Sequence, residues 1–258
     1  MKKLLLFGML TLLSLNVWAD IVTKTIEYRQ GDTRLLGYLA YPKDGAIKYP
    51  GVLVVHEWKG LDDYAKRRTE QLAELGYVAL AADIYGNGKV AADTQEATAL
   101  AKTYKSDRGL LRARVNAALD TLKAQPNVDN KRLAAIGYCF GGTTVLELAR
   151  SGATLAGVVS FHGGLDTPNP MDARNIKAKV LALHGADDPF VPSEQVQAFE
   201  EEMRQAGVDW QLIAYGGAVH GFTNPANGAD NSKGAAYNAA ADRRSWQQMQ
   251  AFFAELFK

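Results

Sequence analysis

The chain has 258 residues, of which 47% are hydrophobic and 22% are charged, and its formal net charge is only +1. The 29 basic and 28 acidic residues are dispersed, so nothing in the charge pattern predicts a nucleic-acid partner or an anionic membrane. The sequence contains one cysteine, which excludes an internal disulfide. No cluster of cysteine and histidine has metal-ligand spacing and no Gly-rich phosphate loop is present, so we expect no metal and no cofactor.

The first segment has the pattern of an export signal. Lys2 and Lys3 precede an apolar run at residues 4–15, and residues 17–19 end in the small-residue pattern that a signal peptidase reads. The apolar run is short for a membrane span. We therefore expect a signal peptide at 1–19 and a periplasmic or secreted bacterial protein with no stable membrane association after cleavage. An uncleaved anchor is the alternative.

Strand-like and helical patterns alternate along the rest of the chain. Short apolar runs predict strands at 35–41, 51–56, 77–82, 132–137, 156–161, 178–184 and 208–215. Helical patterns lie at 62–75, 91–104, 109–124, 141–151, 193–206 and 234–257. This alternation predicts the α/β class, with a mostly parallel central sheet, helices on both faces and a single domain over residues 20–258.

The segment 137–142 joins a predicted strand to a predicted helix and places Cys139 in the pattern Gly-x-Cys-x-Gly. A nucleophile on so tight a turn needs neighbours without side chains, because a nearby Cβ would collide with the following helix. The helix N-terminus also stabilises a thiolate. The pattern therefore predicts a nucleophile elbow with sulfur in place of the usual serine oxygen. A small buried structural cysteine is the alternative.

A base is expected downstream of this turn, because the architecture uses the chain order nucleophile, acid, histidine. Three of the four histidines, His56, His162 and His184, close strand-like runs, where a structural role is more common. His220 instead lies in a loop with glycine on its C-terminal side, beyond the last predicted strand. We therefore predict that His220 is the base.

The acid is expected in the loop after the strand at 178–184, which offers Asp187 and Asp188. Proline follows Asp188 and restricts its backbone conformation, which helps to hold a carboxylate in one place. Asp188 is therefore the preferred acid, and Asp187 stays open as the alternative.

Taken together, these motifs resemble those of the dienelactone hydrolase family of α/β-hydrolases. The matching segments lie between residues 49 and 222, at 56–60, 83–86, 137–142, 185–191 and 219–222. The resemblance implies the α/β-hydrolase fold and a triad of Cys139, His220 and Asp188. It also implies chemistry of the carboxymethylenebutenolidase type, in which a small ester or lactone is cleaved through a thioester acyl-enzyme.

The resemblance also implies roles in the loop that follows the strand at 51–56. Glu57 matches a family glutamate that lies beside the resting thiol and helps to take its proton, whereas an ion pair with Lys59 is the alternative. An oxyanion needs two donors. Elbow geometry points to the backbone N–H of Phe140, and the resemblance points to that of Trp58.

The sequence departs from the family after His220, where substrate is recognised. Family members that act on carboxylated dienelactones hold the carboxylate with arginines, one of which lies just after the catalytic histidine. Here the corresponding stretch, 222–225, has no arginine, and Arg108 and Arg112 cannot be placed from the sequence. We expect substrate-binding residues at a pocket edge that favours neutral acyl groups, formed by Trp58, Tyr85, Phe222 and Asn224.

Two functional interpretations follow. The first is a thiol hydrolase whose partner is a small-molecule ester or lactone, and a broad-specificity carboxylesterase would share its triad. The second is a non-catalytic or thiol-redox-sensing protein on the same fold, although a redox role usually requires a resolving cysteine, which is missing. For the assembly we expect a monomer or a small homo-oligomer.

Overall fold

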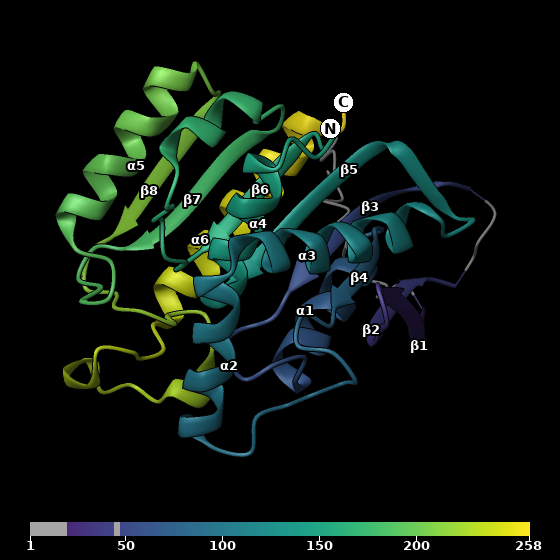
Figure 1. Ribbon diagram of the computed structural model, residues 1–258, viewed down its shortest axis with the longest axis horizontal. Coiled ribbons are helices and arrows are strands. Elements are labelled where there is room, and N and C mark those ends of the chain that lie inside the picture. The colour runs from purple at the N-terminus through teal and green to yellow at the C-terminus, as the bar shows by residue number, and fades with distance from the viewer. Residues whose placement is uncertain (1–19, 44–46) are drawn as a thin grey trace, which may run out of the picture.

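The computed structural model describes residues 20–43 and 47–258, so the expected signal peptide at 1–19 lies outside the described residues. A single eight-stranded sheet runs through the described part of the chain, with the strand order β1-β2-β4-β3-β5-β6-β7-β8 (Figure 1). The strands are β1 (Ile21–Gln30), β2 (Thr33–Pro42), β3 (Tyr49–Val55), β4 (Val78–Ala82), β5 (Val128–Tyr138), β6 (Gly157–Phe161), β7 (Lys179–Gly185) and β8 (Trp210–Tyr215).

The strands from β4 to β8 are paired in parallel, whereas β1 and β2 form an antiparallel hairpin that joins β4. Parallel strands place their carboxyl ends at one edge of the sheet, so the loops after β3, β5, β6, β7 and β8 gather there. The sheet confirms the predicted mostly parallel arrangement, and its strand order is that of the α/β-hydrolase fold.

Helices cover both faces of this sheet, as predicted. Alternate residues of β3 face opposite ways, so Leu53 and Val55 join one core while Val52 and Val54 join the other. The first core packs under α2 (Thr94–Ser106), α3 (Arg108–Lys123), α4 (Phe140–Arg150) and α5 (Ser193–Ala206). The second packs under α1 (Asp63–Glu74) and α6 (Ala239–Leu256).

Helix α6 begins five residues later than the predicted 234–257. The side chain of Asn238 accepts hydrogen bonds from the N–H groups of Ala240 and Ala241 and therefore caps the helix at that point. The preceding residues form short 3₁₀ turns, η2 (Pro225–Asn227) and η3 (Asn231–Lys233), and a further turn, η1 (Pro170–Asn175), precedes β7. The segment after β8 is thus mostly loop before α6 packs on the sheet.

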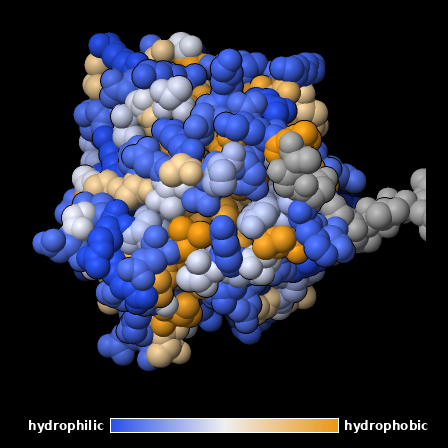
Figure 2. All heavy atoms as spheres, turned by 90° about the vertical axis from the view of Figure 1, so that its right-hand side faces the viewer, coloured by the Kyte–Doolittle hydropathy of each residue, from blue (hydrophilic) through white to orange (hydrophobic). Residues whose placement is uncertain are grey.

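Strand β1 was not predicted from the sequence. It lies at the edge of the sheet and keeps half of its side chains exposed, among them Lys24, Glu27 and Arg29. Charged side chains on an edge strand discourage pairing with another chain. The side of the molecule where β1 and β2 lie is mainly hydrophilic, with its apolar residues in small separate groups (Figure 2).

Candidate active site

Cys139 lies at the turn between β5 and α4, at the carboxyl edge of the sheet. Its backbone has φ 53° and ψ −113°, a conformation that L-residues rarely adopt and that functional sites tend to retain. A Cβ on Gly137 would lie 2.0 Å from the carbonyl oxygen of Gly141, and one on Gly141 would lie 2.2 Å from that of Val55. The flanking glycines are therefore required by the close approach of α4 to β3 and β5.

His220 and Asp188 lie beside this turn, although they come from two other loops. The Nε2 atom of His220 is 3.0 Å from the Sγ atom of Cys139, and its Nδ1 atom is 2.8 Å from Oδ2 of Asp188. Asp188 is buried, and its Oδ1 also accepts the N–H of Phe190 at 2.9 Å. Asp187 instead accepts the N–H of Gly217, so this carboxylate braces the loop after β8.

The surroundings of His220 favour its protonated form. Burial lowers its pKa, but Cys139 and the hydrogen bond to Asp188 outweigh burial and raise the pKa to about 10. The environment of the ring thus favours its cationic form, and a cation in this position stabilises a thiolate. Asp188 orients the ring so that Nε2 points at Cys139.

Glu57 is buried next to the same group of residues. Its Oε2 accepts a hydrogen bond from Nδ2 of Asn224 at 2.6 Å, so the observed partner is an amide and not Lys59. Burial raises the pKa of Glu57 to about 7, with the Asn224 hydrogen bond acting in the opposite direction. The carboxyl group can therefore gain or lose a proton near neutral pH.

The residues expected to supply the two oxyanion donors lie in the elbow and in the loop after β3. Phe140 is the first residue of α4, where backbone N–H groups have no partner within the helix. Trp58 follows Glu57 in the loop after β3, and its carbonyl accepts the hydroxyl of Tyr85 at 2.7 Å. The ring of Tyr85 lies 5.4 Å from that of Phe140, which ties the two loops together.

Of the four residues expected at the pocket edge, Tyr85, Phe222 and Asn224 are buried, and Phe222 departs furthest from the expectation. Phe222 is fully buried and packs edge-on against His162 and near Tyr215, so its side chain belongs to the core and not to an accessible edge. Phe222 lies two residues after His220, and the sequence alone could not fix the direction of its side chain. Tyr85 and Asn224 are largely buried next to Phe140 and Glu57, respectively.

Phe190 is a site residue that the sequence analysis missed. Its ring is 59% exposed and stands edge-on to that of His220, with centroids 5.5 Å apart. An exposed aromatic ring beside the base can form an apolar wall for a substrate group. The available signal was its place two residues after Asp188, in the loop that carries the acid.

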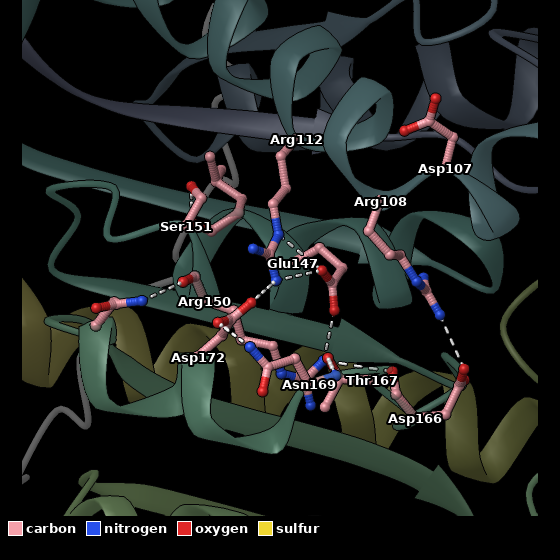
Figure 3. A network of polar contacts seen from close by, with 12 residues as sticks. Asp107, Arg108, Arg112, Glu147, Arg150, Ser151, Asp166, Thr167, Asn169 and Asp172 are labelled. Atoms are coloured by element: carbon pink, nitrogen blue, oxygen red, sulfur yellow. Dashed lines mark hydrogen bonds and ion pairs between the residues drawn. The ribbon is translucent and has the colours of Figure 1, made fainter.

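Arg108 and Arg112, which the sequence could not place, are each paired with a carboxylate in the structure. Arg108 pairs with Asp166 at 2.8 Å, and Arg112 pairs with Glu147 and Asp172 (Figure 3). Arg112 is thus held by two carboxylates, whereas Arg108 has one, and its Nε and Nη1 atoms are buried without a hydrogen-bond partner.

Two further properties bear on what the site can hold. Among residues 20–43 and 47–258, no group of three or more histidine, cysteine, aspartate or glutamate side chains is arranged to bind a metal ion. Within those same ranges, no helix is long and apolar enough to cross a membrane.

Known proteins of similar sequence and structure share this architecture. A putative carboxymethylenebutenolidase from a Synechocystis strain is 28% identical, over 91% of this chain and 97% of its own. The structure of the dienelactone hydrolase-like promiscuous phosphotriesterase P91, from metagenomic libraries, superposes with a TM-score of 0.89 and 45% identity, over 92% of this chain and 99% of that one. The structure of a putative dienelactone hydrolase from Klebsiella pneumoniae superposes with a TM-score of 0.77 and 26% identity, over 91% of this chain and 99% of that one.

The family model of the dienelactone hydrolases matches residues 35–257, which is nearly the whole described chain. The match begins in β2 and ends just beyond α6, so it includes the elbow and the loops of Glu57, Asp188 and His220. The chain therefore belongs to the dienelactone hydrolase family, within the α/β-hydrolase fold.

Proposed function

We propose that this protein hydrolyses small esters or lactones through a thioester formed on Cys139. The observation that carries the proposal is the continuous set of contacts from Sγ of Cys139 through both ring nitrogens of His220 to Asp188, built on a strained turn. A nucleophile, a base and an orienting acid within hydrogen-bond reach are the signature of covalent acyl transfer.

In the acylation step, the thiolate attacks the carbonyl carbon and forms a C–S bond. The electron pair of the carbonyl moves to oxygen, where the N–H groups of Trp58 and Phe140 stabilise the charge. When the intermediate collapses, the C–O bond of the ester breaks and His220 gives its proton to the leaving alkoxide. With a lactone substrate, the leaving alcohol stays attached to the acyl group.

In the deacylation step, neutral His220 takes a proton from water, and the resulting hydroxide attacks the thioester carbonyl. The C–S bond breaks, the carboxylic acid leaves, and the thiolate faces imidazolium again. Glu57 supports this cycle as a carboxyl group with a pKa of about 7, because it can take up or release a proton beside His220 near neutral pH.

The first experiment compares wild type with Cys139→Ala on p-nitrophenyl acetate and on a panel of lactones and short-chain esters. We expect turnover by wild type and background rates for the variant. Equal inactivity of both proteins, with a stable sulfenic acid on wild-type Cys139, would instead support the thiol-redox interpretation.

A second activity is suggested by the similarity to the promiscuous phosphotriesterase P91. We propose that the same thiolate attacks the phosphorus of a neutral p-nitrophenyl dialkyl phosphate and displaces p-nitrophenolate. No arginine lies next to His220 in the sequence, and a triester carries no charge that would need one. Release of p-nitrophenolate by wild type but not by Cys139→Ala would support this activity, and equal release by both would contradict it.

The proposed location is the periplasm or the extracellular space. It rests on the pattern of the first 19 residues, with two lysines before an apolar run. Mass analysis of the protein from a fractionated bacterial host tests this proposal. A mature chain that begins at Asp20 supports it, and an intact leader in the cytoplasm contradicts it.

A further inference from the structure

A set of buried and half-buried polar residues lies behind the nucleophile and takes no part in the steps above. We call it the backing network, and it consists of His162, Thr223, Tyr64, Arg68 and Asp242. Its members come from the end of β6, the loop after His220, helix α1 and helix α6. The network therefore joins segments that are far apart in the sequence to the turn that carries Cys139.

His162 forms the contact with the nucleophile. The backbone N–H of Cys139 points at Nδ1 of His162, with a distance of 3.1 Å, and also donates to the carbonyl of Phe161. A backbone N–H can only donate, so Nδ1 must be the unprotonated nitrogen of the ring. The hydrogen of the neutral ring therefore lies on Nε2, which is 2.6 Å from Oγ1 of Thr223.

Thr223 forms the contact with the loop of the base, because it lies three residues after His220. Its hydroxyl is 2.6 Å from that of Tyr64, and its carbonyl accepts Arg68 at 2.9 Å. Arg68 also donates to Tyr64 and pairs with Asp242 on α6. The position of this loop is thus fixed from two helices on the far side of the site.

The surroundings of His162 keep its ring neutral. Burial lowers its pKa well below the ordinary value, and the nearby His220 and Arg68 lower it further. The rings of His162 and His220 stand 5.5 Å apart, so a charge on both would be repulsive. Other ionisable groups around the thiol are Glu57, which interacts with His220, and Tyr85, which interacts with Cys139.

The backbone of His162 is itself unusual, with φ 41°. A non-glycine residue in this region is strained and is retained where the surrounding structure fixes it. His162 and Cys139 both have positive φ, and they contact each other through the hydrogen bond from the Cys139 N–H. Packing alone would not require a ring with one acceptor and one donor aimed at two separate loops.

We propose that His162 is a positioning residue that links the backbone of Cys139 to the loop of His220 through Thr223. It sets the distance between the sulfur and the base by a route separate from their direct contact. This inference rests on the proposed function, since its consequence for catalysis requires Cys139 as nucleophile. It is, however, a statement about geometry that can be measured without an ester.

Three substitutions separate the two contacts of His162. His162→Asn keeps an acceptor at the δ position and tolerates positive φ, but loses the contact with Thr223. His162→Gln places an amide near the ε position and loses the δ acceptor. His162→Phe keeps a ring and loses both contacts. Thr223→Val removes the hydroxyl at nearly constant shape, and Thr223→Ser is its matched control.

On p-nitrophenyl acetate we expect kcat to fall about 100-fold in His162→Phe, as a small misplacement of reacting groups can do. Loss of a single contact, in His162→Asn, His162→Gln or Thr223→Val, should lower kcat roughly tenfold. KM should stay within about twofold in every variant, because the network does not touch the substrate. Thr223→Ser should retain most of the wild-type rate.

The second readout is alkylation of Cys139 by iodoacetamide, which needs a thiolate but no ester. We expect the ratio of the rate at about pH 6 to that at about pH 9 to fall in His162→Phe and Thr223→Val, because a displaced His220 stabilises the thiolate less. A folded His162→Phe whose kcat and alkylation ratio match wild type would overturn the proposal. If that variant does not fold, the same result in Thr223→Val would overturn it.

The alkylation readout also separates this inference from the proposed function. A falling ratio in a protein that cleaves no ester or lactone would contradict the proposed function and leave the positioning role standing. Normal ester turnover by wild type, with the same ratio of alkylation rates in all variants, would contradict the positioning role and leave the proposed function standing.

Discussion

Helix α4 has a buried polar group of contacts at each end, and the two groups differ in kind. At its N-terminal end, Cys139 meets His220 and Asp188 on a strained turn. At its C-terminal end, Arg150 and Glu147 are fully buried within a set of ion pairs (Figure 3). Both ends carry charged and hydrogen-bonded groups, so the presence of polar contacts alone does not identify the functional end.

At the C-terminal end of α4, the buried charged side chains are paired with groups of opposite charge. Arg150 donates from two nitrogens to the two carboxylate oxygens of Glu202, at 2.8 and 2.7 Å, and from a third to Glu147 at 3.1 Å. Glu147 also pairs with Arg112, and the carbonyl of Leu165 accepts a further hydrogen bond from Arg150. Bidentate, fully hydrogen-bonded pairs of this kind fix a structure and leave no group free to react.

The N-terminal end has the opposite properties. Cys139 is partly exposed and has a backbone conformation that costs energy, while Glu57 and His220 have pKa values shifted upward. Strain and displaced pKa values, together with access, are what a reactive site requires. The comparison shows that the functional end of α4 is recognised by an accessible side chain, a strained backbone and shifted pKa values, and not by buried ion pairs.

The largest expected effect tests the reactive end directly. Cys139→Ala should lower kcat/KM for p-nitrophenyl acetate by at least about 10⁴-fold, because the nucleophile and base act as one unit. Cys139→Ser should fold normally and still lose most activity, since a hydroxyl is far less acidic than a thiol. Near wild-type rates in Cys139→Ser would show that the site is not adapted to sulfur.

A stability measurement tests the ion pairs at the C-terminal end of α4. Arg150→Met removes one partner from a buried ion pair and leaves Glu202 without its bidentate partner, so we expect the free energy of unfolding to fall by about 3 to 5 kcal/mol. The control Lys66→Met removes an exposed ion pair with Asp63 and should change the free energy of unfolding by about 0 to 1 kcal/mol. Equal losses of unfolding free energy in urea titrations of the two variants would contradict the view that the buried ion pairs at the C-terminal end of α4 stabilise the fold.

The two adjacent aspartates separate catalysis from bracing. Asp188→Asn should lower kcat by about 10²- to 10³-fold, because His220 loses the partner that orients and charges it. Asp187→Asn should be mild, since this side chain bonds only to a loop N–H. In combination with His220→Ala, Asp188→Asn should add little. A severe Asp187→Asn and a mild Asp188→Asn would reverse the assignment.

The raised pKa of Glu57 predicts a pH dependence of stability. Between its ordinary pKa of 4.5 and about 7, the folded protein binds more protons than the unfolded chain, so this group's stabilising contribution is lost as pH rises. Relative to Glu57→Gln, wild type should lose up to about 3 kcal/mol across that range. Unfolding titrations of both proteins at about pH 5 and pH 8 measure the difference, and parallel curves would contradict it.

The smallest expected effect concerns substrate charge. Because Asn224 bonds to Glu57 and no arginine follows His220, neutral esters should have higher kcat/KM than carboxylated analogues of equal size. Asn224→Arg should narrow this gap by roughly tenfold through a charge-assisted contact. A wild-type preference for the carboxylated substrate would mean that another basic group reaches the pocket.

Much of the fold could be predicted because the buried strands are continuous apolar runs. Strand β3, for example, is fully buried, and its sequence carries no competing signal. Strand β1 was missed because an exposed edge strand with Lys24 and Glu27 lacks such a run. The start of α6 was misplaced because Asn238 acts as a cap only once its side chain turns back on the helix.

The candidate site divides in the same way. Cys139, Asp188 and His220 could be found because each lies in a short motif whose residue types carry the geometry. The wrong placement of Phe222 and the omission of Phe190 have one cause, since the direction of a loop side chain depends on packing that no local pattern records. The bond from Cys139 to His162 joins two strand ends and was likewise beyond the sequence.

The most direct test is rapid-quench mass spectrometry of wild type mixed with p-nitrophenyl acetate. The account predicts one acetyl group per chain, located on the peptide that contains Cys139 and released by hydroxylamine as a thioester would be, with none on Cys139→Ala. Acetylation at another residue, or full turnover by Cys139→Ala without any acylated cysteine, would contradict the central claim that this thiol is the nucleophile.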